Sequence, residues 1–404
     1  MQKAIKFVAL VMAFVCALIF GFVGYGDINV PDSYIAADTG SADTGSVLFT
    51  CECYESAVPA DSNDFARSYP AQIKLLGAIP VKNSTVTVVH RRYVTLGGSV
   101  FGLRIFADGV IVTGVGSVES GTASPAAKAG IKKGDIIKEI NGKAITSNQD
   151  VSQSAKQSQG KELTVKLVRG GKTKTVTIDP VKDANGEYVL GMWVRDSSAG
   201  VGTVTFIDNR TGTLAGLGHA ICDADTGNIM PLASGDMLNV IIRGCVKGTS
   251  GTPGELCGVF GAKTLGELYV NGSTGVYGVV SEKDNSAPVI PVALGSEVKT
   301  GKAQIVSTVD SGEPQYFDIE ITKIRRGDDE DKNMVIKVTD EDLLRKTGGI
   351  VQGMSGSPIV QNGMLVGAVT HVFVNDPQQG YAIFAQTMIS TAEKLEKSLA
   401  DNAA

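Results

Sequence analysis

The stretch Gly348-Gly-Ile-Val-Gln-Gly-Met-Ser-Gly-Ser-Pro-Ile-Val360 is the most informative part of this 404-residue chain. Ser355 follows Gly353 by two residues and precedes a glycine, so it lies in a turn whose backbone can adopt conformations closed to most residues. In such a turn the amide N–H groups of Gly353 and Ser355 can point into one pocket, where paired donors stabilise an oxyanion. The stretch therefore predicts a nucleophilic serine with its oxyanion hole; a capping hydroxyl in a glycine-rich turn is the alternative interpretation.

A nucleophilic serine needs a base within hydrogen-bond reach, and histidine is the usual one near neutral pH. The chain offers three candidates, His90, His219 and His371. His219 follows an apolar strand predicted over residues 202–207, and small neighbours on both sides leave room around its ring. We therefore expect His219 to be the base.

A carboxylate should accept from the other ring nitrogen of that histidine and fix its tautomer. Asp340 is the candidate, because it comes at the end of a strand predicted over residues 334–338. An N-cap role for the helix that begins at Glu341 is its alternative. The other carboxylates that fit are Asp342, Asp223 and Asp225.

A compact module is predicted from Gly98 to about Asp179. Ser124-Pro125 begins a short helix, Asn141-Gly142 marks a hairpin, and Ser147 begins a second helix. The run from Ser124 to Gly142 resembles PDZ domains of bacterial envelope proteases. The resemblance implies a groove that accepts an extended peptide by strand addition. We expect this groove beside the strand that contains Leu103, Arg104 and Ile105, and the basic surplus of the module favours an acidic partner.

The N-terminus predicts a membrane anchor. No charged residue lies between Phe7 and Gly26, while Lys3 and Lys6 precede this stretch. Its length suffices for a helix that crosses a bilayer core of about 30 Å, and the positive flank places the remainder outside the cytoplasm. A cleaved signal peptide is the rival interpretation.

The following residues, 27–70, are polar and read as a linker. They repeat Asp-Thr-Gly at 38–40 and 43–45, and a third copy stands at 225–227. An aspartic protease uses two such aspartates. Here the first two copies lie five residues apart without a buried strand before either, so turn chemistry is the better explanation.

Composition excludes several classes of protein. With 20% charged residues, 43% apolar residues and 49 glycines, the chain is neither a coiled coil nor a multi-span membrane protein. A net charge of −5 gives no reason to expect nucleic-acid binding, and three histidines make a zinc site hard to build. We expect the six cysteines to act mostly as small apolar residues. A disulfide bond between Cys245 and Cys257 is the one pairing considered. The acidic run over residues 328–331 reads as a solvated loop.

Further resemblances narrow the family. Gly-x-Ser-Gly-x-Pro resembles the nucleophile loop of chymotrypsin-like serine proteases, whose substrate-lining strand would fall at Thr370, His371 and Val372. The stretches 193–206, 216–221, 347–358 and 371–376 together resemble the stage IV sporulation protein B family of serine peptidases. That resemblance maps the triad onto His219, Asp340 and Ser355.

The same resemblance implies a biological role. It implies a protein made in the forespore that acts in the space between the forespore and mother-cell membranes. There it would cleave itself and a membrane-protein regulator of an intramembrane metalloprotease, which leads to activation of the late mother-cell sigma factor.

We therefore expect a mainly β protein, a membrane-anchored PDZ domain followed by a chymotrypsin-like double β-barrel serine peptidase domain. The expected segments are an anchor (1–26), a linker (27–70), a short β segment (71–97), the PDZ domain (98–182), the peptidase domain (183–390) and a C-terminal helix (391–404). The chemistry needs no cofactor and no metal. The expected partners are protein substrates, a peptide ligand and the membrane, and not nucleic acid.

Two rival functions differ in class. One is a non-catalytic PDZ scaffold that binds peptides in the envelope. The other is an esterase, against which the sequence argues because Gly353-Met-Ser-Gly-Ser357 lacks the final glycine of the Gly-x-Ser-x-Gly elbow.

Overall fold

The computed structural model of the chain describes residues 2–37, 44, 46–53, 66–118, 124–284, 288–325 and 331–403. Most of the first two Asp-Thr-Gly copies and residues 328–330 of the acidic run lie outside this description. The chain forms two compact units, Met1–Tyr93 with Pro291–Lys299, and Val94–Ile290 with Thr300–Ala404. The strands β5 (Tyr93–Leu96) and β18 (Val289–Pro291) lie where the chain passes between the units.

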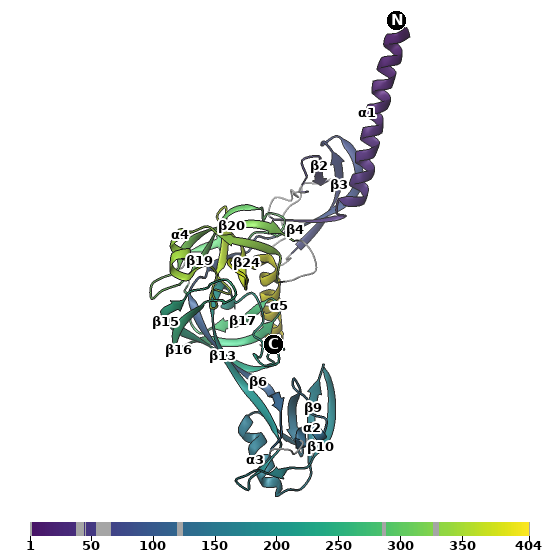
Figure 1. Cartoon of the computed structure of the whole chain (residues 1–404). Coiled ribbons are helices and arrows are strands. Elements are labelled where there is room, and N and C mark those ends of the chain that lie inside the picture. Colours follow the sequence, from purple (N-terminus) through teal and green to yellow (C-terminus); the bar gives the residue numbers. More distant parts are fainter. Residues whose placement is uncertain are drawn as a thin grey trace. The chain divides into compact units, whose positions relative to one another are not determined.

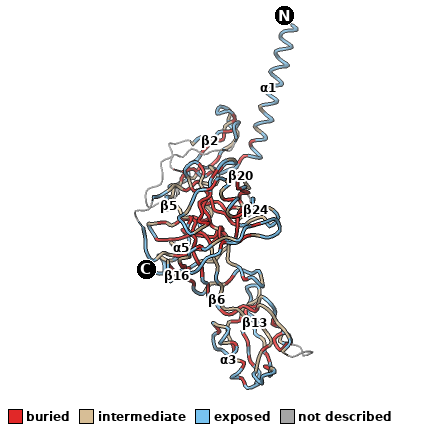
Figure 2. Tube along the Cα trace, turned by 60° about the vertical axis from the view of Figure 1, so that its left-hand side comes forward, coloured by how far each residue is buried: buried red, intermediate tan, exposed pale blue. Residues whose placement is uncertain are grey.

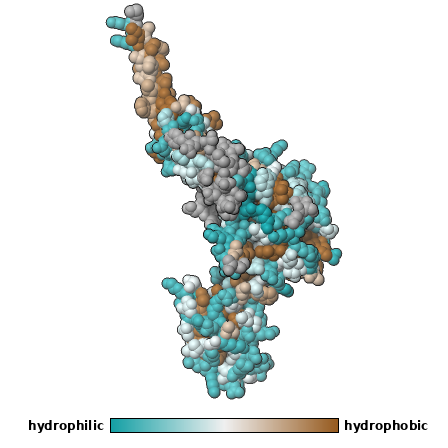
Figure 3. All heavy atoms as spheres, turned by 180° about the vertical axis from the view of Figure 1, so that it is seen from behind, coloured by the Kyte–Doolittle hydropathy of each residue, from teal (hydrophilic) through white to brown (hydrophobic). Residues whose placement is uncertain are grey.

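The first unit combines one long helix with a small sheet. The helix α1 (Gln2–Asn29) is long and apolar enough to cross a membrane, and apolar side chains cover it in Figure 3. Its 28 residues span about 42 Å, against a bilayer core of about 30 Å. This helix supports the predicted membrane anchor.

The stretch expected as a linker is partly a sheet. Strands β1 (Ser33–Ala37), β2 (Phe49–Cys53), β3 (Ala66–Leu75) and β4 (Ile79–Val89) pair in the order β1-β4-β3-β2. Tyr34, Ala36 and Phe49 are buried against Ile73 and Val86. The linker prediction missed β1 and β2 because each has only five residues and buries at most three of them, too few for a clear alternation.

The PDZ module contains two helices and small paired strands. Its elements are α2 (Pro125–Lys128), β7 (Ile136–Ile140), β8 (Lys143–Ala144), α3 (Asn148–Ser158), β9 (Leu163–Arg169), β10 (Lys172–Ile178), β11 (Val181–Lys182) and β12 (Tyr188–Val189). Both predicted caps are present: Ser124 accepts from the Ala127 amide, and Ser147 forms a capping box with Asp150. A core of aliphatic residues around Val110, Val165 and Leu167 packs these elements together.

Six strands from segments far apart in the sequence pair to form a first barrel. Its strands are β6 (Val100–Val115), β13 (Met192–Asp208), β14 (Thr213–Gly216), β15 (Leu232–Val246), β16 (Glu255–Gly272) and β17 (Gly275–Val280). The sheet runs β6-β15-β16-β17-β14-β13, and the additional pairing of β13 with β6 closes it. Phe101, Leu103, Val204 and Leu214 fill the interior. Cys245 and Cys257, on paired strands, are free thiols.

The second barrel carries the loop that contains Ser355, residues 348–357, called the serine loop below. Strands β19 (Gly301–Ser307), β20 (Gln315–Ile324), β21 (Met334–Val338), β24 (Asp376–Phe384), β23 (Met364–Phe373) and β22 (Pro358–Gln361) close in that order. Helix α4 (Glu341–Thr347) leads into the loop before β22, and α5 (Ala385–Ala403), which begins earlier than the expected 391, packs against both barrels (Figure 1). Figure 2 shows buried residues concentrated near β24. The predicted double β-barrel is therefore confirmed.

Candidate active site

The serine loop is clamped between the two barrels. Ser355 lies in the turn between α4 and β22, and its hydroxyl donates to the carbonyl of Thr370 at 2.8 Å. Gly356 has φ 93°, and a Cβ there would lie 2.1 Å from the Thr203 carbonyl oxygen and 2.4 Å from the Leu217 amide nitrogen. Only glycine fits this position.

All carbonyl groups from residue 352 to residue 356 are held by hydrogen bonds. Their donors, in chain order, are the Leu256 amide (2.9 Å), the Thr203 hydroxyl (2.8 Å), the Ser357 amide (2.9 Å), the Thr203 amide (2.8 Å) and the Thr205 hydroxyl (2.7 Å). A peptide unit is planar and trans, so a held carbonyl also fixes the direction of the next N–H, which points the opposite way. The loop therefore has a defined set of N–H directions.

Two N–H groups of residues 352–356 are unused. Within the described part of the chain, the amides of Gly353 and Ser355 donate no hydrogen bond. The intervening amide of Met354 donates to Val351 (3.1 Å), and that of Gly356 donates to Val369 (2.7 Å). Unsatisfied backbone donors are rare beside a buried loop, and two of them flanking a serine hydroxyl are what an oxyanion requires.

His219 follows β14 after a strained turn. Leu217 and Gly218 both have positive φ, 63° and 70°, and a bulky residue in this region is an outlier that clusters at functional sites. The Nδ1 atom of His219 lies 2.8 Å from the Ala220 carbonyl oxygen. A proton on Nδ1 satisfies that carbonyl and leaves Nε2 free to accept another. Burial lowers the pKa of His219 below its ordinary value, so the ring is neutral at pH 7.

A second histidine lies against the first. The ring of His371, on β23, is 4.7 Å from that of His219 between centroids, and its Nδ1 is 3.7 Å from a carboxylate oxygen of Asp331. The Thr370 hydroxyl donates to the Asp331 carbonyl at 2.9 Å. Burial and the neighbouring His219 lower the pKa of His371 to about 4.

Sequence reasoning missed Asp331. Asp331 is the last residue of the acidic run that the sequence predicts to be a solvated loop. The composition of a loop does not indicate that one of its residues contacts a histidine elsewhere in the chain. The structure thus brings Ser355, His219 and the predicted strand residues Thr370 and His371 close together, and it adds Asp331.

Asp340 lies elsewhere on the second barrel. Its carboxylate accepts from the Leu343 amide at 2.9 Å, which caps α4, and from the Asp318 amide at 3.2 Å. Among the described residues it bonds to neither imidazole. The assignment of Asp340 to a triad therefore stays a prediction.

The three alternative carboxylates are also engaged with cations. Asp342 pairs with Lys346 at 3.0 Å within α4. Asp223 and Asp225 both pair with Arg195, the latter at 2.7 Å. These ion pairs give each of the three carboxylates a partner other than a histidine.

The predicted peptide groove needs correction. Leu103, Arg104 and Ile105 of β6 pair with β13 on one edge and with β15 on the other. Both edges of this stretch are thus occupied, so it offers no place for an added strand. Alternation of apolar residues along a strand indicates its buried face but carries no information about its edges.

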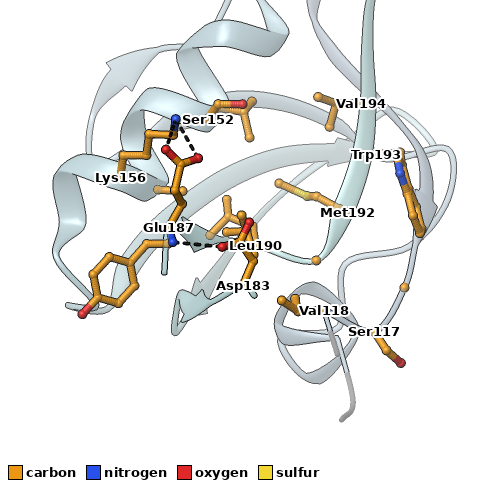
Figure 4. Close-up of a pocket in the computed structure, with 16 residues that line it drawn as sticks. Ser117, Val118, Ser152, Lys156, Asp183, Glu187, Leu190, Met192, Trp193 and Val194 are labelled. Carbon is orange, nitrogen blue, oxygen red and sulfur yellow. Dashed lines mark hydrogen bonds and ion pairs between the residues drawn. The ribbon is translucent and has the colours of Figure 1, made fainter. Parts of the chain in front are cut away.

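A cavity elsewhere in the module has the features of a peptide groove. It has a volume of about 390 Å³ and lies between α3 and the beginning of β13. Figure 4 shows Met192 and Val194 on the strand side and Ser152 and Lys156 on the helix side. Residues 192–194 pair with β6 along one edge, and no strand in the described part of the chain pairs with the other. The ion pair of Lys156 with Glu187, at 2.9 Å, lies at the rim.

Comparisons with known proteins agree with this division. Residues 186–389 match the family model described as SpoIVB peptidase S55, and residues 83–179 match the model of the PDZ domain. A putative zinc metalloprotease of Lactococcus lactis is 30% identical over 129 residues, 29% of this chain and 29% of that protein. A putative zinc metalloprotease of Neisseria meningitidis is 32% identical over 160 residues, 40% of this chain and 32% of that protein. The chain thus spans about a third of the length of these relatives.

Solved structures give partial matches. The PDZ domain of the SdrC-like protein from Listeria monocytogenes is 27% identical, with a TM-score of 0.19, over 22% of this chain and 87% of that one. The active form of the Rv3671c protease from M. tuberculosis is 16% identical, with a TM-score of 0.30, over 49% of this chain and 74% of that one. The family model extends over half of the sequence and includes both His219 and Ser355. This chain belongs to the SpoIVB peptidase S55 family.

Proposed function

We propose that the protein is a serine endopeptidase with Ser355 as nucleophile and His219 as general base. The observation that carries the proposal is the pair of unused amides, Gly353 and Ser355, fixed beside the Ser355 hydroxyl. Serine hydrolases need such donors where the negative charge develops, and each is worth roughly 3–4 kcal/mol in the transition state.

The reaction follows from this geometry. The Ser355 Oγ attacks the scissile carbonyl carbon, its proton passes to Nε2 of His219, and the amides hold the resulting oxyanion. Collapse expels the amine, which takes the proton from His219 and leaves an acyl-enzyme. Water, deprotonated by the same imidazole, then attacks the ester and restores Ser355.

Substrate would lie along β23, at Thr370, His371 and Val372. The pairing of β23 with β24 shifts register between Val369 and Val372, so the backbone leaves the regular ladder at Thr370 and His371. The Thr370 carbonyl, which accepts from Ser355 here, is then placed to accept from a substrate amide. That exchange would release the serine hydroxyl toward His219.

The third catalytic position is proposed for Asp340 on the family resemblance. In that role its carboxylate would orient the imidazole of His219. Because the carboxylate caps α4 in this structure, the role requires Asp340 to leave the cap.

The cavity between α3 and β13 is proposed as the peptide groove of the PDZ domain. A peptide would add as a strand to the open edge at residues 192–194 and place one apolar side chain among Val151, Ala155 and Leu190. Following the family resemblance, the substrates are a regulator of an intramembrane metalloprotease and the chain itself. The site of action is the space between the forespore and mother-cell membranes.

The test compares full-length protein in detergent micelles with Ser355→Ala. Self-processing is followed by intact mass over hours, and reactivity is followed with a fluorophosphonate, which transfers its phosphoryl group to an activated serine with loss of fluoride. We expect fragments and labelling in the parent and neither in the variant. Equal fragments in both would mean contamination, and absence of labelling from the parent would favour the PDZ scaffold.

A further inference from the structure

Two buried threonines on β13 face the serine loop. Thr203 and Thr205 are both 0% exposed, and as alternate residues of one strand they share a face. Val204, between them, points into the core of the first barrel. A buried hydroxyl without a hydrogen-bond partner is costly, so threonine at these positions implies a partner.

The partners are glycine carbonyls on both sides of Ser355. The Thr203 hydroxyl donates to Gly353 at 2.8 Å, and the Thr205 hydroxyl donates to Gly356 at 2.7 Å. The Thr203 amide also donates to the Ser355 carbonyl at 2.8 Å. Two residues of the first barrel therefore hold three peptide units of a loop that belongs to the second.

These bonds enclose the peptide unit that supplies the oxyanion donor. The Ser355 amide belongs to the unit between residues 354 and 355. Thr203 holds the units on both sides of it, one through its hydroxyl and one through its amide. Gly353 and Gly356 have φ of 96° and 93°, and glycine opposes rotation of its peptide units only weakly, so the bonds from β13 add to the restraint that the Ser357 amide places on the Met354 carbonyl.

We infer that Thr203 and Thr205 are positioning residues that keep the serine loop in its oxyanion-binding conformation. The inference rests on the proposed function, since it assigns a role in that same reaction. Without the Thr203 hydroxyl, the Gly353 carbonyl is a buried acceptor with no donor, and its peptide unit gains by turning toward another partner. Such a turn displaces the adjacent Ser355 amide from the oxyanion position.

The test uses valine, which has the shape of threonine without its hydroxyl. Thr203→Val and Thr205→Val are compared with Thr203→Ser, which keeps the hydroxyl, in full-length protein in micelles. Thr213→Val is the matched control, because Thr213 is a buried strand residue of the same barrel whose hydroxyl bonds to Thr211 rather than to the loop. The readouts are the fluorophosphonate inactivation rate at saturation, the concentration for half-maximal rate, and the unfolding temperature.

We expect Thr203→Val to lower the saturated inactivation rate at least tenfold, with the half-saturating concentration unchanged. Loss of an oxyanion donor lowers turnover about 10²–10³-fold in a serine protease, which sets the upper range of the effect. Thr203→Ser should restore most of the rate, and Thr213→Val should leave it intact.

A wild-type rate in Thr203→Val, or an equal fall in Thr213→Val, would overturn the inference. If Thr203→Val does not fold, Thr205→Val decides, since its hydroxyl holds the Gly356 carbonyl on the other side of Ser355; failure of both to fold would make the threonines structural residues. Failure of the proposed function is distinguishable, because it appears in the parent itself, either as no labelling or as labelling that survives Ser355→Ala.

Discussion

The imidazole rings of His219 and His371 lie 4.7 Å apart between centroids and are tilted by 36°. Burial lowers the pKa of both rings, and the carboxylate of Asp331 opposes this lowering in both. Lys332 adds to the lowering at His371. A neutral pair is thus favoured at pH 7. In the proposed mechanism, the proton that His219 would take from Ser355 arrives beside the neutral ring of His371 and the carboxylate of Asp331.

The pH dependence of serine reactivity should reflect this environment. His219 acts as a base only when neutral, so reactivity falls as the pH drops through its pKa. Because that pKa is lowered, we expect the acid limb of fluorophosphonate labelling to lie below 6.5, the ordinary value for histidine. The measurement is the labelling rate from pH 4 to pH 8, with His219→Ala as the inactive control. A midpoint at or above 6.5 would contradict the burial of the ring.

Removing the charge of Asp331 should shift the acid limb of the pH profile of labelling. The carboxylate stabilises the protonated form of both histidines, so Asp331→Asn is expected to lower the pKa of His219 further and to shift the acid limb to lower pH. Asp331→Glu, which keeps the charge, should restore most of the parental profile. An unchanged limb in Asp331→Asn would show that this carboxylate does not act on the base.

Two substitutions of Asp340 can distinguish its role as the N-cap of α4 from the proposed role of its carboxylate in orienting His219. Asparagine caps a helix about as well as aspartate, whereas alanine at an N-cap costs about 0.5–2 kcal/mol. If the residue only caps α4, Asp340→Asn should keep both stability and labelling, and Asp340→Ala should lower the unfolding free energy by about 1 kcal/mol. If it orients His219, both variants should label slowly, since loss of a triad aspartate lowers turnover about 10⁴-fold. Chemical denaturation and labelling together distinguish the two roles.

The sequence predicted the local features of helices, strands and turns better than it predicted which segments contact one another. Helix caps at Ser124 and Ser147 and the glycine-rich turn at Ser355 depend on local chemistry, which a sequence displays directly. The open edge of β13 and the two occupied edges of β6 depend on pairings between residues about 80–140 positions apart, and alternation carries no signal for them. Asp331 and Thr203 were missed for the same reason, because their partners, on β23 and in the serine loop, lie far from them in the sequence.

Peptide binding to the proposed groove should depend on β13 and not on β6. Met192 lines the cavity, so Met192→Lys should place an ammonium group where the apolar side chain of the peptide is proposed to lie and weaken peptide binding at least tenfold. Arg104→Ala is the matched control, because Arg104 lies on the strand first expected to form the groove and pairs with Asp236. Peptides selected from a displayed library on the full-length protein serve as probes, with fluorescence anisotropy as the readout. Loss of binding in Arg104→Ala but not in Met192→Lys would return the groove to β6.

Two glycines with positive φ, one in a crowded position and one in open space, allow the effect of crowding at the serine loop to be measured. Gly356 and Gly363 have φ of 93° and 75°, so alanine at either costs about 1–2 kcal/mol in backbone conformation. Their surroundings differ: a Cβ on Gly363 meets nothing within 4 Å, whereas one on Gly356 meets the Thr203 carbonyl oxygen at 2.1 Å.

Because that contact is with backbone, a rotamer change cannot relieve it, and the loop must move away from β13. We expect Gly363→Ala to lower the unfolding temperature slightly and to keep its labelling rate. Gly356→Ala should show a similar or larger loss of stability together with a labelling rate lowered at least 100-fold, because the Ser355 amide leaves the oxyanion position. Equal labelling by the two variants would mean that reactivity at Ser355 does not depend on the contact between its loop and β13.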